Sequence, residues 1–177
     1  EQTMQELGLD AVYTGGGTSG PALARLGEAV KEACRDAARL PDLRLLRYRA
    51  HADFYFGQGA GDALLAGKIV VRGREIQDEN KRPLATWTIN GNMALSMAGA
   101  KRLEPLGRYT VRIGDFLPRG SLLAPGVVDA DEEIRPGDEV IVEGEQAFGI
   151  GRAKMSGWEM VASRRGVAVE IRHIKER

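Results

Sequence analysis

The C-terminal stretch from Arg108 to Arg177 most strongly limits how this 177-residue chain can fold. Short apolar runs such as RYTVRI and DEVIVE alternate there with Gly, Pro and Asp turns. A turn every roughly ten residues is typical of small β-barrels, because each strand is short and is followed at once by a turn. The sequence therefore predicts a β-barrel over residues 107–177.

The preceding block, residues 43–106, has a mixed pattern. LRLLRYRAHADFYF alternates in part and predicts a strand, GQGAGDALLAG predicts a glycine turn with a short helix, and KIVVRGREI predicts another strand. Asn90-Gly91, between LATWTI and MALSM, is the strongest short hairpin signal in the chain. GAKRLEPLG predicts a short helix or turn at the boundary with the barrel.

Residues 1–42 are predicted to form a helical N-terminal segment. TMQE has the spacing of a capping box, GGGTSG is a flexible break, and Pro21 suits the first position of an amphipathic helix that ends near Leu40-Pro41. The predicted class is thus α+β: a helical segment over 1–42, a small mixed α/β domain over 43–106, and a β-barrel over 107–177.

Common enzyme and cofactor patterns are missing from the sequence. GQGAG is followed by Asp62 where a dinucleotide fingerprint needs glycine, and GGGTSG lacks the lysine of a phosphate-binding loop. His51 and His173 are far apart, and the DADEE acids fit a loop before a strand better than a cation site. We expect no metal, no cofactor and no catalytic residue in this chain, so a small-molecule enzyme is the weakest interpretation.

Membrane and export signals are also missing. No apolar run approaches the roughly 18 residues that cross a bilayer, and the N-terminal residues do not resemble a signal peptide. Cys34 is the only cysteine, which fits a reducing compartment. We expect a cytoplasmic chain that does not enter a membrane.

The 25 basic and 25 acidic side chains cancel, but they are unevenly placed. Residues 129–145, here called the acidic run, hold eight acids against one base, whereas residues 152–177 hold seven bases against three acids. A basic segment of this kind favours RNA as a partner. Two alternatives stay open: a solvated mixed surface, and a protein-interaction module that uses the acidic run.

Four segments, LLAPGVVDAD, RPGDEVIV, GIGRAKMSGWEM and RRGVAVEIRH, resemble in this order the PUA domain, an RNA-binding module of RNA-modifying proteins. The block with YRAHADFYFGQGAGDALLAGKIVVRGR and LATWTINGNMALSMAGAKRL resembles the C-terminal part of archaeosine synthases, archaeal tRNA-modifying enzymes related to the tRNA-guanine transglycosylases. The resemblance covers roughly residues 44–177. It implies a small α/β domain followed by a PUA-type β-barrel, which together hold tRNA.

The same resemblance implies that this chain does not carry out the reaction. The family's catalytic Pro-Cys motif, with Lys-Pro-Tyr and a histidine after it, is absent, since Ala33 precedes Cys34. We therefore expect the tRNA-binding portion of an archaeosine synthase-like enzyme. The expected partners are tRNA and, as a second candidate, a partner modification enzyme.

The candidate RNA-binding residues come from three segments. In the APGV loop, small residues and free backbone N–H groups would let a sugar-phosphate backbone approach, above all at Gly126. Strand alternation places Arg152 and Lys154 on one face. The terminal strand is predicted to turn Arg172 away from the core. The full set is Arg119, Ala124, Pro125, Gly126, Val127, Arg152, Lys154, Arg164, Arg165, Arg172 and His173.

Packing expectations accompany this set. Alternation predicts that Val167, Val169 and Ile171 face the core of the barrel and that Ala168, Glu170 and Arg172 face away from it. Trp158, beside a turn, is expected to cover the core rather than to stack on a base, and Trp87 is expected to be a packing residue.

Overall fold

The computed structural model describes Glu28, Glu32 and residues 43–89 and 91–177. The predicted capping box, glycine break and helix boundaries within residues 1–42 lie outside the described residues, as does Asn90. By its internal contacts the chain divides into a unit of residues 1–46 and a unit of residues 47–177. The account below concerns the second unit, together with the whole of the helix that enters it. The boundary predicted between residues 106 and 107 stays a prediction.

Helix α3, Leu43–Phe56, replaces the strand predicted for LRLLRYRAHADFYF. The strand prediction was wrong because it followed the partial alternation of the sequence. A four-residue spacing decides the structure instead: Tyr48 packs against the core, and Ala52 and Phe56 are buried in it. This spacing places the three side chains on one helix face.

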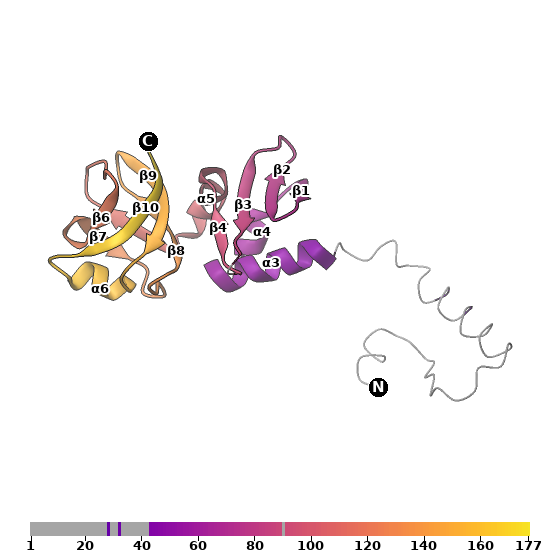
Figure 1. The fold of residues 1–177 in the computed structure, drawn as a ribbon, viewed down its shortest axis with the longest axis horizontal. Coiled ribbons are helices and arrows are strands. Elements are labelled where there is room, and N and C mark those ends of the chain that lie inside the picture. The colour runs from indigo at the N-terminus through magenta and orange to yellow at the C-terminus, as the bar shows by residue number, and fades with distance from the viewer. Residues whose placement is uncertain (1–27, 29–31, 33–42, 90) are drawn as a thin grey trace, which may run out of the picture. The chain divides into compact units, whose positions relative to one another are not determined.

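The rest of the first half is a small sheet with helices. The elements are α4 (Ala60–Leu64), β1 (Ile69–Arg72), β2 (Glu75–Asp78), β3 (Pro83–Trp87), β4 (Met93–Leu95), α5 (Met97–Leu103) and the 3-10 helix η2 (Glu104–Leu106). The strands form an antiparallel sheet in the order β1-β2-β3-β4 (Figure 1). KIVVRGREI was predicted as one strand but folds back on itself, since Gly73 adopts a φ of 59° in the turn between β1 and β2. The β3–β4 hairpin around Gly91 is confirmed.

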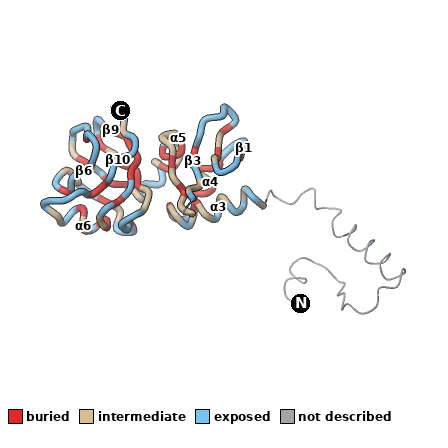
Figure 2. Tube along the Cα trace, viewed as in Figure 1, coloured by how far each residue is buried: buried red, intermediate tan, exposed pale blue. Residues whose placement is uncertain are grey.

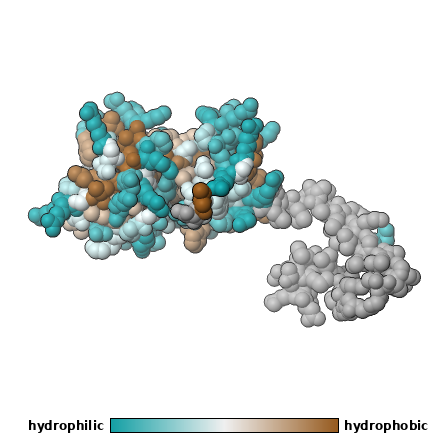
Figure 3. Space-filling view, viewed as in Figure 1, coloured by the Kyte–Doolittle hydropathy of each residue, from teal (hydrophilic) through white to brown (hydrophobic). Residues whose placement is uncertain are grey.

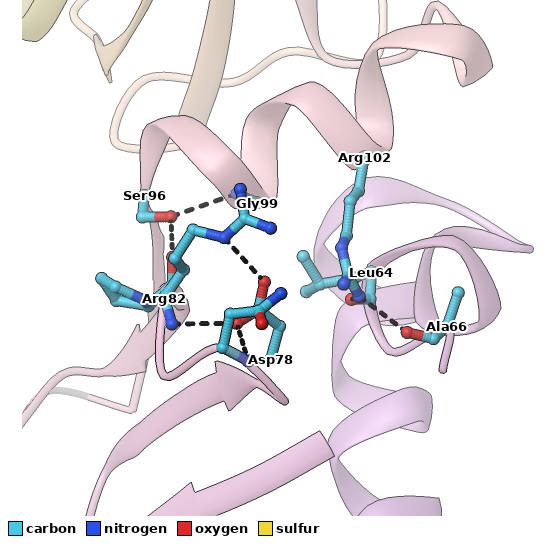
Figure 4. A network of polar contacts seen from close by, with 9 residues as sticks. Leu64, Ala66, Asp78, Arg82, Ser96, Gly99 and Arg102 are labelled. Atoms are coloured by element: carbon cyan, nitrogen blue, oxygen red, sulfur yellow. Dashed lines mark hydrogen bonds and ion pairs between the residues drawn. The ribbon is translucent and has the colours of Figure 1, made fainter. Parts of the chain in front are cut away.

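Side-chain caps hold the helices of this half in place (Figure 4). Ser96 begins α5 by accepting a hydrogen bond from the Gly99 N–H at 3.1 Å. Arg102 of α5 donates to the carbonyls of Leu64 and Ala66, at 2.8 and 2.9 Å, and so binds the end of α4. These bonds satisfy backbone groups that a helix end leaves unpaired.

The turn after β2 is fixed by Asp78, also drawn in Figure 4. Its carboxylate accepts hydrogen bonds from the N–H groups of Asn80 and Arg82, each at 2.9 Å. The Arg82 side chain adds a further contact at 3.1 Å. The carboxylate thus takes the place of backbone partners in a tight turn.

The second half is one curled six-stranded sheet. Its elements are β5 (Thr110–Ile113), β6 (Ser121–Leu123), the 3-10 helix η3 (Ala124–Gly126), β7 (Val127–Ala130), β8 (Glu139–Glu143), β9 (Ala147–Ala153), α6 (Gly157–Ala162) and β10 (Val167–Glu176). The strand order is β6-β10-β9-β8-β5-β7, and only the β5–β8 pair is parallel. The edge strands β6 and β7 are joined by η3 (Figure 1). The predicted α+β class is confirmed, with the barrel as a half-barrel.

The alternation predicted along β10 is broken by a bulge. Val167 is 37% exposed, whereas Ala168 and Val169 are both fully buried. The pairing of β10 with β6 shifts register between Val167 and Val169. A bulge lets two consecutive side chains share one side of a strand, so the prediction was wrong for Val167 and for Ala168.

The two sheets contribute to two hydrophobic clusters, which appear as buried segments in Figure 2. One cluster lies within the half-barrel and includes Val111 and Ile134. The other contains the buried side chains of α3, α4, α5 and the first sheet, and also Ile141, Phe148 and Ile150 from β8 and β9. The first half therefore completes its core with side chains of the barrel.

Within the described ranges, no helix combines the length and the apolar character that crossing a membrane requires.

Candidate nucleic-acid interface

A row of polar side chains crosses the outer side of the half-barrel. In the strand register, Glu170 of β10 is paired with Ser121 of β6 on one side and with Arg152 of β9 on the other. Arg152 is paired in turn with Glu139 of β8. The row places an arginine between two carboxylates, so its charge is partly balanced within the sheet.

Arg152 and Lys154 are exposed on either side of buried Ala153, which confirms the predicted alternation. The Lys154 ammonium forms an ion pair with Glu170 at 2.6 Å. Arg152 donates a hydrogen bond from Nε to the Gly137 carbonyl at 3.0 Å and makes no ion pair among the described residues. Of the two cations, only Lys154 forms an ion pair among the described residues.

The Arg172 side chain makes its polar contacts within the protein. Its guanidinium donates to the Leu95 carbonyl at 2.6 Å and forms an ion pair with Glu139. Leu95 lies in β4 and Glu139 in β8, so Arg172 connects the first sheet to the half-barrel. His173, the next residue, is exposed.

Glu139 is the most strongly perturbed acid of this surface. Burial raises its pKa to about 6, and the Arg172 charge and the Leu95 N–H hydrogen bond oppose that rise. The carboxyl therefore changes its charge within the mildly acidic range. The ion pair with Arg172 weakens when this proton binds.

A pH series should detect this proton through stability. The folded-state pKa lies above the ordinary value of 4.5, so folding favours the protonated form. The stabilisation is complete below the ordinary pKa and is lost as the pH rises through about 6. Relative to Glu139→Gln, which does not titrate, the wild-type free energy of unfolding should fall by about 2 kcal/mol between about pH 4 and pH 8. Urea unfolding of both proteins measures the difference, and a difference independent of pH would contradict the prediction.

The APGV loop forms η3, and its backbone is largely occupied. The Ala124 N–H donates to the Gly166 carbonyl at 2.9 Å, and the Val127 N–H donates to the Ala124 carbonyl. The prediction of free N–H groups was therefore wrong at Ala124 and Val127. Ala124 is buried and Pro125 is exposed.

Gly126 is close to the Phe116 ring. A Cβ at Gly126 would lie 2.6 Å from the Phe116 Cζ atom and 3.4 Å from a Leu122 methyl group. The ring of Phe116, 38% exposed, thus occupies the space beside Gly126 that was expected to receive a sugar-phosphate backbone. The glycine lets this ring pack against the loop.

Two of the predicted arginines lie beside this loop. Arg164 and Arg165 are exposed in the turn that leads to Gly166, and the Ala124–Gly166 hydrogen bond connects that turn with η3. Arg119 is exposed between β5 and β6 and makes no ion pair among the described residues. The structure therefore brings the loop together with Arg164 and Arg165, and Arg152 together with Arg172, as two groups.

Trp158 is a surface residue that the sequence interpretation missed. It is 67% exposed on α6, so the expectation that it covers the core was wrong. A capping box between Ser156 and Glu159 places it in the first turn of this helix, and SGWE could have revealed that spacing. Helix α6 packs against η3 and β7. Trp87, by contrast, packs against the first core, as predicted.

Exposed apolar side chains surround the loop, and Figure 3 shows hydrophobic surface where β6 and β7 lie. Leu123 is 55% exposed and Val128 64% exposed. We call the region around η3 the loop surface; it consists of Leu123, Pro125, Val128, Trp158, Arg164 and Arg165. It combines an exposed indole with two cations.

Three acids of the acidic run form ion pairs within the fold. Asp129 forms an ion pair with Arg112 at 2.8 Å, and Glu143 forms one with Arg177 at 2.9 Å. Glu139 is paired with Arg172. Because these carboxylates serve contacts within the fold, the interpretation of the run as a protein-recognition face is not supported. Among residues 43–89 and 91–177, no three His, Cys, Asp or Glu side chains are grouped as a metal site requires.

Comparison with known proteins agrees with this geometry. The family model described as PUA domain matches residues 113–175. Archaeosine synthase subunit alpha of Methanosarcina acetivorans is 42% identical over 99% of this chain. The chain is a homologue of part of archaeosine synthase. It spans only 30% of the Methanosarcina protein.

Two further relatives extend the comparison. The tRNA-guanine(15) transglycosylase of Pyrococcus furiosus is 32% identical over 72% of this chain and 24% of that protein. A crystal structure described as a protein of unknown function matches with a TM-score of 0.65 and 30% identity, over 98% of this chain and 61% of its own. The PUA domain and the relationship to both enzyme families, expected from the sequence, are confirmed.

Proposed function

We propose that this chain is the tRNA-binding portion of an archaeosine synthase-like enzyme. Its PUA domain would hold the RNA, and the base-modifying reaction would take place in other parts of the enzyme. The main support for this proposal is the loop surface. It contains an exposed tryptophan and two exposed arginines within the segment that matches the PUA family.

The composition of the loop surface suits RNA. Arg164 and Arg165 can neutralise phosphates, which supplies affinity without reading sequence. The exposed indole of Trp158 offers a flat face on which an unpaired base can stack, a contact worth about 1–3 kcal/mol per base. Leu123 and Val128 supply apolar contact beside it. A charged but partly apolar surface of this kind fits a structured RNA with exposed bases.

Other residues of the predicted set would support this binding. Arg119 and Arg152 would contact phosphates outside the loop surface. Lys154, Arg172 and His173 would be secondary, because the first two are ion-paired within the fold. The loop residues Ala124, Pro125, Gly126 and Val127 would shape the surface.

Salt dependence of tRNA binding tests the proposal. For four or five phosphate contacts, the logarithm of the association constant should fall against the logarithm of salt concentration with a slope of about −3 to −4. Replacing both Arg164 and Arg165 by alanine should lower the magnitude of that slope by about 1.4 to 1.8, because two contacts are lost. Fluorescence anisotropy of a labelled archaeal tRNA transcript measures both values.

A matched control removes two exposed arginines elsewhere. Arg72 and Arg74 lie at the β1–β2 turn and are also exposed, so their double alanine variant has the same net charge as the test variant. We expect its slope to remain that of the wild type. Absence of tRNA binding at low salt, or equal effects of the two double variants, would refute the proposal.

The proposal also includes a partner protein and a cellular location. The name of the Methanosarcina relative contains the words subunit alpha, which supports a second protein subunit as a partner of this chain. We place the chain in the cytoplasm, in agreement with its single cysteine.

A further inference from the structure

A pocket lies within the 47–177 unit, between the first sheet and the half-barrel, away from the loop surface. Its volume is about 390 Å³, and α3, the β3–β4 hairpin, β8, β9 and β10 line it. Pockets that bind small ligands in proteins have volumes of roughly 300–1,000 Å³. The pocket therefore has room for a compact organic group.

One part of the pocket wall is apolar and aromatic, and the rest is polar or charged. Tyr55 and Phe56 at the end of α3, Met93 of β4 and Ile171 of β10 line the apolar part. Tyr55 is fixed by a hydrogen bond from its hydroxyl to the Gly91 carbonyl at 3.0 Å. Walls held in this way favour a flat, partly apolar ligand.

Most charges at the pocket cancel one another. Glu139 is paired with Arg172, and Glu170 with Lys154. The two charged pocket residues left over are Arg152 and Asp138, neither of which makes an ion pair among the described residues.

Arg152 and Asp138 determine which charged and hydrogen-bonding groups a ligand of this pocket needs. Arg152 donates from Nε to Gly137, which leaves its terminal N–H groups for an anion. Asp138 accepts the Arg135 N–H with Oδ2, and its other oxygen can accept from an N–H donor. The pocket thus suits a ligand that has an anionic group, a flat body and N–H donors at its edge.

We propose that this pocket binds one nucleotide unit, with the base between the apolar walls, an N–H group of the base on Asp138, and the phosphate on Arg152. The inference extends the proposed function, because the unit would be an unpaired nucleotide of the bound RNA. A free nucleotide has the same chemistry and is the other possible source. A free amino acid also has an anionic carboxylate and N–H donors. Most amino acids, however, lack a flat side chain that could cover the apolar part of the pocket wall.

The experiment compares pocket variants with matched variants of another pair on the same sheet. Arg152→Ala and Asp138→Asn remove the two charged pocket side chains that form no ion pair among the described residues. Arg112→Ala and Asp129→Asn make the same changes at an exposed ion pair outside it. Each protein is titrated with tRNA by anisotropy, and with the four nucleoside 5′-monophosphates and free tryptophan by NMR of the Gly137 and Gly151 amides.

We expect monophosphates to shift the two amides in the wild type and in the matched variants. Each pocket variant should weaken tRNA binding by about tenfold, as the loss of one hydrogen bond to a charged group predicts. Weaker monophosphate binding in the pocket variants with unchanged tRNA affinity would also support the pocket and identify free nucleotide as the source.

Other results separate the two proposals. Wild-type tRNA binding that the pocket variants leave unchanged, with no response to monophosphates, would overturn the pocket inference and leave the proposed function intact. A response of the amides to tryptophan and not to nucleotides would overturn it too. Monophosphate binding without any tRNA binding would refute the proposed function and retain the nucleotide pocket.

Discussion

Replacing Gly157 by alanine should destabilise the protein by about 3 kcal/mol, because a side chain has no room at that position. A Cβ there would lie 2.0 Å from the Asp131 carbonyl oxygen and 2.8 Å from the Asp131 carbonyl carbon. Both atoms belong to the backbone, so no side-chain rotation relieves the clash. Gly157 also donates its N–H to Ile134 at 3.1 Å, which holds the start of α6 against the same turn.

The comparison variant is Gly114→Ala. A Cβ at Gly114 would meet only the Phe116 ring, at 3.7 Å, which is ordinary contact. Its free energy of unfolding should stay close to that of the wild type, since alanine also restricts the unfolded chain. Urea unfolding midpoints measure both proteins, and equal losses in the two variants would show that the close approach of α6 is not the cause. The Gly157 variant should also bind tRNA more weakly, because α6 carries Trp158.

Truncating Phe148 to alanine should cost about 4 kcal/mol and should weaken both halves of the 47–177 unit together. Phe148 lies on barrel strand β9, is 2% exposed, and belongs to the core of the first half. The Lys101 ammonium of α5 lies 3.8 Å from the centre of its ring. The mutation therefore removes apolar contact and a cation–π contact between the halves.

The two tryptophans allow each half to be followed separately. Trp87 lies in β3 and Trp158 in α6, so the variants Trp158→Phe and Trp87→Phe leave one reporter each. In both backgrounds, Phe148→Ala should move the urea midpoint by the same amount. Val161→Ala, at a 48% exposed position of α6, serves as the control and should change little. A shift of the Trp158 transition without the Trp87 transition would contradict the shared core.

Much of the barrel could be predicted because its strands are separated by local turn residues. The β3–β4 hairpin and α5 were found for the same reason, since their signals lie within a few neighbouring residues. Helix α3 was missed because its partial alternation fits a strand, and only the core shows that Ala52 and Phe56 share a face. The β10 bulge has no local mark in the sequence, so the face of Ala168 could not be predicted.

The candidate site was predictable only in part, since the contacts that decide it are distant in the chain. Arg172 was expected to face RNA, but its partners Glu139 and Leu95 are 33 and 77 positions away. Gly126 was expected to leave open space, yet Phe116 approaches it from another segment. The exposed positions of Arg152, Arg164 and Arg165 were found correctly, because turns and strand alternation are local properties.

The participation of β8 and β9 in the neighbouring core bears on how this PUA domain can be handled. Excision at residue 107 would uncover Ile141, Phe148 and Ile150 and would break the ion pair between Glu104 and Arg177. Such a fragment should expose apolar surface and aggregate, even though its strands are complete. Moving this barrel into another protein would therefore require residues 43–106 as well, or polar replacements on the uncovered side.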